Sequence, residues 1–418
     1  MRVEARTTCR SCGSDKLFSV LSLGEQYISA FVEDEAENSV LSKAPLELVI
    51  CDQHRGGCGL VQLKHTVPAD LMFKQYWYRS SINSSMTLAL QDIAASIERT
   101  IKLAKDDIVV DIGCNDGTLL RSYRTPGIAR VGFEPATNLI PYATRGTNRI
   151  INDYFTAKSY TKNFSTHKAK AITSIAMFYD LEQPNEFTQD VADCLDDSGV
   201  WVIQMSYLPS MLTQNAFDNI CHEHLEYYSL AALRGLLERR DLEVFDVELN
   251  DVNGGSFRVY VKHHGCNSMG NDDSREHLSR IEKLETEMKL DETGVYAEFA
   301  SRVKALRGQL LEFIKAEHKA GRKIYVYGAS TKGNTLLQYC NLDNKLITAA
   351  AERNSDKWGK KTVGTLIPII SEEQARAEKP DYFLVLPWHF LQEFIEREHA
   401  YLKSGGKFIV PLPEFRII

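Results

Sequence analysis

The 418-residue sequence has no apolar run of the roughly 18 to 20 residues that a membrane-spanning helix needs. Its first residues, MRVEARTTCR, lack the apolar segment of an export signal. It also lacks a basic excess, since 49 Lys and Arg stand against 56 Asp and Glu, for a net charge of -7. Binding to nucleic acid phosphates requires a basic surface. We therefore expect a cytoplasmic protein, a monomer or weak homodimer, with neither a membrane nor a nucleic-acid partner.

Cysteine is scarce after residue 58, where only five of the nine cysteines occur. Disulfides are rare in a reducing compartment, so the cluster at the start indicates metal binding. Two pairs of soft ligands in one short segment are typical of a four-thiolate zinc site, which is closed and therefore structural. His54 or His65 as a substitute ligand, and buried thiols without metal, are the alternatives. The predicted ligands are Cys9, Cys12, Cys51 and Cys58.

Beyond the cysteine cluster, strand-like and helix-like stretches alternate, which predicts parallel sheets covered by helices. A helix over 86–104 leads to the first buried strand at 108–112. Further strands are expected at 130–133, 171–176, 199–205, 242–247 and 256–263.

A polar, charged segment interrupts the alternation, which then restarts with a long helix to residue 320. Strands follow at 323–327 and 347–351, then one ending at 387, and the chain closes with a hairpin-like GGKFIVPLP. The fold class is therefore α/β, with a small separate module followed by two Rossmann-like domains. The predicted boundaries are 1–75 for the zinc-binding module, 76–265 for the central domain, 266–300 for a linker and connecting helix, and 301–418 for the C-terminal domain.

The segment IVVDIGCNDGTLL places a glycine-containing turn directly after the first strand. Open α/β sheets bind ligands at this end of their strands. The next strand, RVGFEP, ends in Glu134, about twenty residues on, where a carboxylate can accept hydrogen bonds from ribose hydroxyls. The spacing DxGxxxG differs from the dinucleotide GxGxxG, whose helix N-terminus takes a pyrophosphate, so S-adenosylmethionine is favoured over NAD. The predicted cofactor-binding residues are Asp111, Gly113, Cys114, Asn115, Gly117, Glu134, Pro135, Asp153 and Met177.

Two further clusters carry groups capable of chemistry. Tyr76 and Tyr78 lie in the segment YWYRSSIN, and His222, Glu223 and His224 stand in a row. Two imidazoles beside a carboxylate offer a base near neutral pH with a partner to orient it. A metal site is one alternative if the row is a strand, because His222 and His224, two positions apart, would then point to the same face. The other alternative is a polar surface segment.

These motifs together resemble the sugar C-methyltransferases of antibiotic and surface-polysaccharide pathways, which methylate C-3 of dTDP-linked 4-keto-hexoses. The resemblance covers essentially the entire chain. It implies a zinc-binding N-terminal domain, a central S-adenosylmethionine domain and a C-terminal Rossmann-like domain that helps to hold the nucleotide sugar. The motifs are the paired cysteines, YRSSINSSM, VVDIGCNDGTLL, MFYDLEQP, HEHLEYYSL, NGGSFR and YGASTKGNTLLQYC.

The resemblance implies proton abstraction next to a ketone, followed by enolate attack on the methyl group of the cofactor. His224 is the expected base, Glu223 orients it or the sugar, and Tyr78 faces the reacting centre, with Tyr76 and His222 as further catalytic candidates. The family commonly has a tyrosine before HEH, whereas this chain has Cys221, a weak donor. Tyr227, Tyr228 and Tyr179 are the residues that could compensate.

In YGASTKGNT, small residues permit backbone approach and Lys332 can pair with a diphosphate. An unoccupied structural turn is the other interpretation of this motif. Methylation of sugar oxygen or nitrogen, a non-catalytic binding protein and a dehydrogenase are the competing functions. The expected substrate-binding residues are Asn83, Ser84, Tyr179, Tyr207, Arg258, Lys332, Asn334, Thr335, Glu352 and Lys357.

Overall fold

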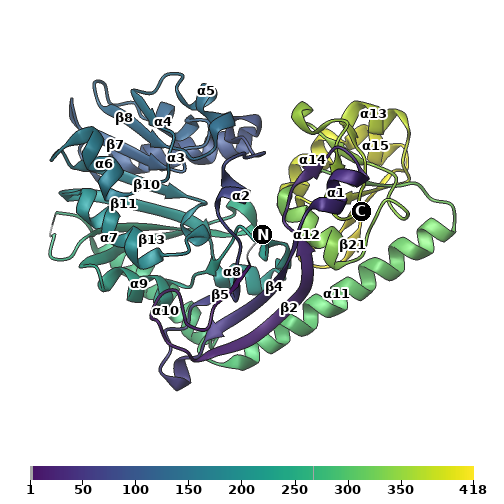
Figure 1. The fold of residues 1–418 in the computed structure, drawn as a ribbon, viewed down its shortest axis with the longest axis horizontal. Coiled ribbons are helices and arrows are strands. Elements are labelled where there is room, and N and C mark those ends of the chain that lie inside the picture. The colour runs from purple at the N-terminus through teal and green to yellow at the C-terminus, as the bar shows by residue number, and fades with distance from the viewer. Residues whose placement is uncertain (1–2, 267) are drawn as a thin grey trace.

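The computed structural model describes residues 3–266 and 268–418. Two α/β units lie side by side, with strands of the N-terminal segment between them (Figure 1). The long helix α11 (Thr293–Lys319) runs along the lower side of the molecule from these strands to the second unit. Within the described residues, no helix is both long and apolar enough to cross a membrane.

The first unit contains a seven-stranded sheet of order β13-β14-β11-β10-β7-β8-β9. Its strands pair in parallel except β14, which is antiparallel to both of its neighbours. The predicted strands are confirmed, and β9 is an additional edge strand. The bounds are β7 (Ile108–Ile112), β8 (Ala129–Phe133), β9 (Arg149–Ile151), β10 (Ala169–Ile175), β11 (Leu195–Ser206), β13 (Leu242–Asn250) and β14 (Ser256–His263).

Helices cover both faces of this sheet because its central strands are apolar on both sides. Val109 and Val202 belong to the apolar cluster that includes α3, whereas Val110 and Ile203 belong to the cluster that includes α7 and α9. Successive side chains of a strand point to opposite faces, so an unbroken apolar run requires two covering layers. The helices are α3 (Ser84–Thr100), α4 (Thr118–Ser122), α5 (Ile140–Ala143), α6 (Ala157–Phe164), α7 (Pro184–Cys194), α9 (Leu230–Glu238) and α10 (Asp272–Glu287).

The second unit contains a six-stranded sheet of order β18-β16-β15-β19-β20-β21, parallel apart from the last strand. Strand β16 is shorter than predicted, because only Ala350 and Ala351 pair with β15. The strands are β15 (Ile324–Tyr327), β16 (Ala350–Glu352), β18 (Ile369–Ser371), β19 (Tyr382–Val385), β20 (Lys407–Val410) and β21 (Arg416–Ile417). The helices are α12 (Thr331–Tyr339), α13 (Glu372–Ala377), α14 (Leu391–Arg397) and α15 (His399–Lys403).

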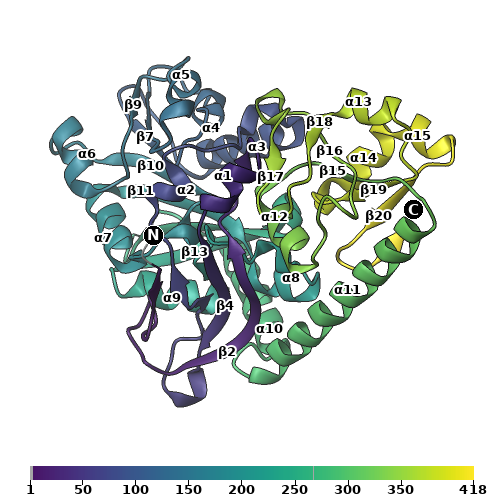
Figure 2. The same cartoon turned by 45° about the vertical axis from the view of Figure 1, so that its right-hand side comes forward.

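The N-terminal module was predicted to be separate, but in the structure it is joined to both units. Its strands β2 (Leu17–Tyr27), β4 (Lys43–Cys51) and β5 (Val61–Leu63) share a sheet with β12 (Glu226–Tyr227) of the first unit. Strand β3 (Phe31–Val32) pairs with β17 (Lys361–Thr362) of the second unit. A module of this size buries too little apolar surface to be stable alone, and the shared strands extend its core. Figure 2 shows β2 and β4 running between the two units.

Each sheet has a point at which the chain order reverses. In the first sheet, β8 lies on one side of β7 and β10 on the other, and in the second, β16 and β19 flank β15 in the same way. Loops diverge at the carboxyl ends of such strand pairs and leave a crevice where ligands bind. The fold therefore supplies two ligand-binding crevices.

Candidate active site

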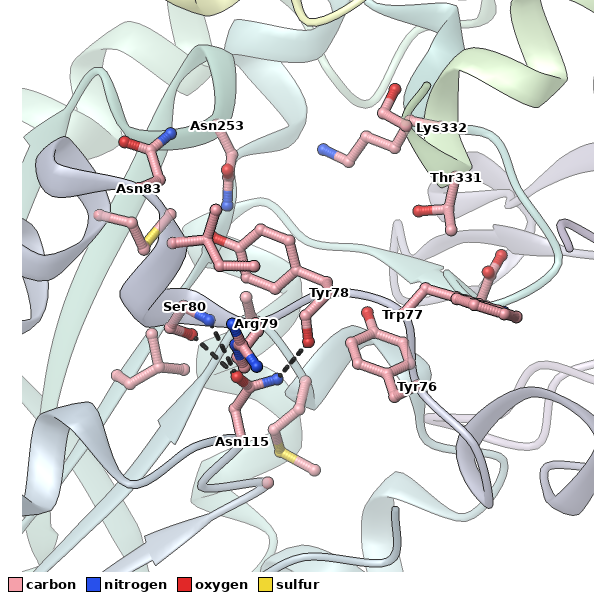
Figure 3. A pocket seen from close by; sticks show the side chains of 18 of the residues that line it. Tyr76, Trp77, Tyr78, Arg79, Ser80, Asn83, Asn115, Asn253, Thr331 and Lys332 are labelled. Carbon is pink, nitrogen blue, oxygen red and sulfur yellow. Dashed lines mark hydrogen bonds between the residues drawn. The ribbon is translucent and has the colours of Figure 1, made fainter. Parts of the chain in front are cut away.

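A cavity of about 550 Å³ is shared by the two crevices. Its walls include Gly113 after β7, Met177 after β10, Gly328 after β15 and Pro387 after β19. Figure 3 shows side chains of both units directed into this space. One ligand site is thus built from the switch points of two sheets.

The glycine-containing loop after β7 has the backbone geometry that its sequence predicts. Gly113 adopts a φ of 70°, and Asn115 adopts a φ of 51°. The loop is tied to the end of β8, because the Asn115 amide donates to Glu134 Oε2 at 2.7 Å and the Ala136 amide donates to Glu134 Oε1 at 2.8 Å. Burial raises the pKa of Glu134 to about 7. These contacts hold the Glu134 carboxyl at the cavity wall.

The residues present fit S-adenosylmethionine. Glu134 is 5% exposed and lines the cavity, and its oxygens retain lone pairs for ribose hydroxyls after accepting two amides. Gly113 presents bare backbone to the cavity, which lets a ligand approach the strand end. Asp111, on β7, also lines the cavity and accepts a hydrogen bond from Thr173 Oγ1 of β10 at 2.6 Å. Among the remaining predicted cofactor residues, the cavity wall includes Cys114, Asn115, Pro135, Asp153 and Met177.

Gly117 lies outside the cavity wall. It is the residue before α4 and has a φ of 78°, which a side chain would strain. A Cβ there would also meet the Ala143 carbonyl at 2.8 Å. This glycine therefore shapes the turn into the helix and allows close packing, where the sequence had suggested a ligand contact.

Residues 76–83, here called the strap, cross over the glycine-containing loop after β7, residues 113–117, which is called the cofactor loop below. Asn115 holds the strap from both sides: its Oδ1 accepts from the Ser80 amide at 3.0 Å, and its Nδ2 donates to the Tyr78 carbonyl at 3.1 Å (Figure 3). The Ser81 amide donates to Asp116 Oδ2 at 2.8 Å. Ser84, the first residue of α3, is not part of the cavity wall, whereas Asn83 is.

The two tyrosines of the strap occupy different surroundings. Burial raises the pKa of Tyr76, and the charges of Asp180 and Glu223 raise it further. Burial also raises the pKa of Tyr78, whose neighbouring charge is Asp116 at the cofactor loop. Tyr76 is therefore the tyrosine close to the HEH row, while Tyr78, which sequence had favoured, lies toward the cofactor loop.

His224 has the geometry of a neutral base. Its Nδ1 lies 2.9 Å from the carbonyl oxygen of Asn219, so the proton of the neutral ring is on Nδ1 and Nε2 is free to accept. Burial and the nearby charge of Lys332 lower the pKa of His224 to about 3. The ring of Tyr179 packs against it with centroids 4.3 Å apart. His224 and Tyr179 both line the cavity.

His222 does not line the cavity, which corrects the catalytic role expected from the sequence. Its Nε2 lies 3.0 Å from the Ala44 carbonyl on β4, and the residue is 3% exposed. His222 and His224 therefore point in different directions: His222 packs against the N-terminal module, whereas His224 lines the cavity. No metal-ligating group of three or more was found among the described residues at this row.

Three buried carboxyl groups face the cavity near His224. Glu223 lines it, and its Oε2 has no hydrogen-bond partner. Asp180 and Asp218 also line it, each with an unpartnered Oδ1. Neither aspartate is among the site residues predicted from the sequence. The available signal was an acid at the end of β10 in MFYD and another four residues before HEH in FDNI.

The turn after β15 contributes the wall from the C-terminal unit. Lys332 lines the cavity, and its Nζ donates to Asn219 Oδ1 at 2.6 Å. Glu352 and Lys357 line the cavity too. Glu352 accepts from the Ala329 amide at 2.9 Å, and Lys357 donates to the Ala329 carbonyl at 2.8 Å, so both residues hold the turn.

Four other predicted substrate residues lie elsewhere, because their side chains are committed to packing. Tyr207 donates to Glu285 Oε1 at 2.7 Å, and Arg258 pairs with Asp92 at 2.9 Å. Asn334 donates to the Ala30 carbonyl at 3.1 Å. Thr335 is buried within α12. None of these four belongs to the cavity wall.

The four N-terminal cysteines come together, and their Sγ atoms all lie within 4.8 Å of one another. Cys9 and Cys58 are 3.6 Å apart, and Cys12 and Cys51 are 3.5 Å apart. Tetrahedral zinc with Zn–S bonds of about 2.3 Å places its sulfurs about 3.8 Å apart. The amide of Cys58 approaches the Cys51 sulfur at 3.3 Å. The cluster therefore fits a closed zinc site, without either histidine as a ligand.

Replacing Glu134 with glutamine should weaken binding of S-adenosylhomocysteine by about 10-fold or more, since a hydrogen bond to a charged group contributes about 1.5 to 3 kcal/mol. Isothermal titration measures the change. Glu98→Gln is the matched control, because Glu98 also accepts two backbone amides, at 2.9 and 2.7 Å, but lies outside the cavity wall. Equal effects of the two substitutions would contradict a ligand contact at Glu134.

The affinity for S-adenosylhomocysteine should also fall as pH drops through about 7, the pKa to which burial raises Glu134. Ribose hydroxyls bind the ionised carboxylate better than the neutral acid, so the favourable form is present above this pKa and is lost below it. Titrations across this range in wild type and Glu134→Gln test the expectation. Burial raises the pKa of Asp111 to about 7 as well, and a slope that persists in the variant would assign the effect to that residue.

Three family models match successive parts of the chain. Residues 9–73 match a zinc binding domain, residues 86–247 match a methyltransferase domain, and residues 251–413 match the C-methyltransferase C-terminal domain. Together these cover the N-terminal module and both units of the fold.

A curated relative matches almost the whole chain. The C-methyltransferase NovU of Streptomyces niveus is 33% identical over 414 residues, which is 98% of this chain and 96% of that protein. Among solved structures, the mitomycin 7-O-methyltransferase MmcR is 15% identical, with a TM-score of 0.34, over 44% of this chain and 55% of its own. The plantazolicin methyltransferase BpumL in complex with SAH is 14% identical, with a TM-score of 0.34, over 42% and 83%.

Proposed function

The chain belongs to the C-methyltransferase family, and on that premise we propose that it methylates a nucleotide-linked 4-keto-deoxyhexose at C-3. It is an S-adenosylmethionine-dependent methyltransferase with a zinc-binding N-terminal domain. The observation that carries the proposal is a single cavity in which a neutral histidine, the cofactor loop and the βα turn of a second Rossmann-like sheet meet.

The reaction begins at a carbon next to a ketone. Such a carbon loses a proton only if a base lies near it and donors stabilise the oxygen of the resulting enolate. His224 Nε2 takes the proton, and the carbon–hydrogen electron pair becomes the new carbon–carbon double bond as the carbonyl π pair moves to oxygen. Because Nδ1 is held by the Asn219 carbonyl, the ring presents its lone pair without a tautomer change.

The cofactor loop positions the methyl donor beside this carbon. Asp111, Gly113 and Glu134 would hold S-adenosylmethionine at the carboxyl end of β7. When bound, the cofactor supplies a methyl group attached to a positively charged sulfur, and this sulfur leaves as a neutral thioether when a carbon nucleophile takes the methyl group. The strap covers the loop through Asn115 and keeps water from the bound donor.

The C-terminal unit holds the nucleotide part of the substrate in this proposal. The turn after β15 exposes backbone at Gly328 and Ala329 to the cavity, and Glu352 and Lys357 brace it. A crevice of this type in an α/β sheet suits a nucleotide. Asn83 and Tyr179 line the same cavity, and Tyr179 packs against the base, so the sugar would lie beside it.

Incubation with S-adenosylmethionine and a panel of nucleotide 4-keto-deoxyhexoses tests the proposal. We expect one substrate to gain the mass of a methylene group and its NMR spectrum to lose the ring proton at C-3. A product that keeps all its ring protons and gains an O-methyl or N-methyl signal would overturn C-methylation. No mass gain with any sugar, despite binding of the cofactor, would favour a binding protein without turnover.

A further inference from the structure

Lys332 reaches from the C-terminal unit toward the reacting centre of the central unit. It is the second residue of α12, and Figure 3 shows its side chain extended into the cavity, away from its own helix. Its Nζ donates to Asn219 Oδ1 at 2.6 Å, across 113 positions of sequence. The ammonium is therefore fixed by a residue of the loop that carries the HEH row.

Asn219 anchors both the ammonium and the base. Its side-chain oxygen accepts from Lys332, while its backbone oxygen faces His224 Nδ1 at 2.9 Å and accepts from Tyr227 at 3.1 Å. The residue is 4% exposed, so water does not compete for these contacts. One rigid residue thus sets the base and a cation beside each other.

Tyr76 and Tyr179 also line the cavity near the base, whereas the polar groups that follow Asn219 in sequence are committed elsewhere or weak. The hydroxyl of Tyr228 donates to Glu226 at 2.9 Å, and that of Tyr227 donates to Asn219. Cys221 also lines the cavity, and a thiol donates weakly. Burial and Lys332 lower the pKa of His224 to about 3, and a weak base needs a strong electrophile at the carbonyl oxygen.

We propose that Lys332 is a catalytic residue that donates a hydrogen bond from Nζ to the keto oxygen, with Asn219 as its positioning residue. As His224 takes the proton and the carbon–hydrogen pair forms the double bond, the π pair moves to oxygen beside the ammonium. Lys332 keeps its protons throughout, so the proton removed from carbon is the one gained by His224. This assignment rests on the proposed function and replaces the diphosphate contact expected from sequence.

The test is deuterium exchange at C-3 of the keto sugar in D2O, with S-adenosylhomocysteine in place of the methyl donor. Wild type should exchange this hydrogen. Lys332→Met should slow the exchange by about 10²- to 10³-fold, the effect of removing one oxyanion donor, whereas the surface control Lys304→Met should not. The affinity of Lys332→Met for dTDP or UDP alone should stay at the wild-type value.

Two results would overturn the assignment. The first is exchange by Lys332→Met at the wild-type rate. The second is a loss of affinity for the nucleoside diphosphates with an unchanged rate at saturating sugar, which is the result expected if Lys332 binds the diphosphate. No exchange by wild type with any keto sugar would instead refute the proposed function itself. Retained binding of S-adenosylhomocysteine shows that the variants are folded.

Asn219 is tested separately. Asn219→Leu removes the side-chain acceptor but keeps the backbone carbonyl, so the exchange rate at saturating sugar should fall while the KM for the sugar is unchanged. Asn219→Asp keeps an oxygen for Lys332 and should recover most of the rate. Equal rates in the two variants would remove the positioning role.

Discussion

Replacing His224 with alanine should reduce methyl transfer to a keto sugar by about 10²- to 10⁴-fold, the range expected for loss of a general base. The reason is that His224 presents a free Nε2 to the cavity while its Nδ1 is held by a backbone carbonyl. Mass spectrometry of the product measures the loss. Binding of S-adenosylhomocysteine should be nearly unchanged, since the cofactor contacts lie on another loop.

The deuterium exchange assay separates the base from later steps. His224→Ala should lose exchange at C-3 together with methyl transfer, because both need the proton to leave carbon. His263→Gln is the control, since His263 also faces a backbone carbonyl, that of Leu195 at 3.3 Å, but lies outside the cavity wall. A His224→Ala enzyme that still exchanges the hydrogen would show that another group is the base.

Loss of the zinc ligands should unfold the N-terminal module. Structural zinc in small domains contributes about 10 kcal/mol or more of apparent folding free energy, and a Cys51→Ser variant removes a fully buried thiolate from the cluster. We expect zinc content near one per chain in wild type, near zero in the variant, and a lower melting temperature. Cys266→Ser should have neither effect, because Cys266 is outside the cluster.

This loss should also reach the active site. Strand β5 of the module pairs with β12, which directly follows the HEH row, and the Leu63 amide donates to the Leu225 carbonyl at 2.8 Å. His222 is held by Ala44 of the same module. Cys51→Ser should therefore lose methyl transfer even where the central unit still binds S-adenosylhomocysteine. A metal-free variant with full activity would contradict this coupling.

Local patterns were sufficient for the elements and for the motifs on them. Strand β7 and strand β14 have the bounds predicted from sequence, because both are rich in the β-branched and aromatic residues that favour strands. Each cysteine pair needs only a short turn and so predicts a metal site, and the pairing of β2 with β4 brings the two pairs together. The cofactor loop is equally local, because strand, glycine turn and carboxylate follow one another within two adjacent strands.

Contacts between distant segments could be decided only by the tertiary structure. His222 was predicted at the chemistry, whereas packing directs it to Ala44, and no sequence pattern predicted that Lys332 would donate to Asn219. Arg258 and Tyr207 look available in sequence, yet buried acids engage both. Spacing along a chain determines which residues share a strand or a turn; which partner a side chain meets across domains depends on how whole sheets pack, and that information is spread over the entire sequence.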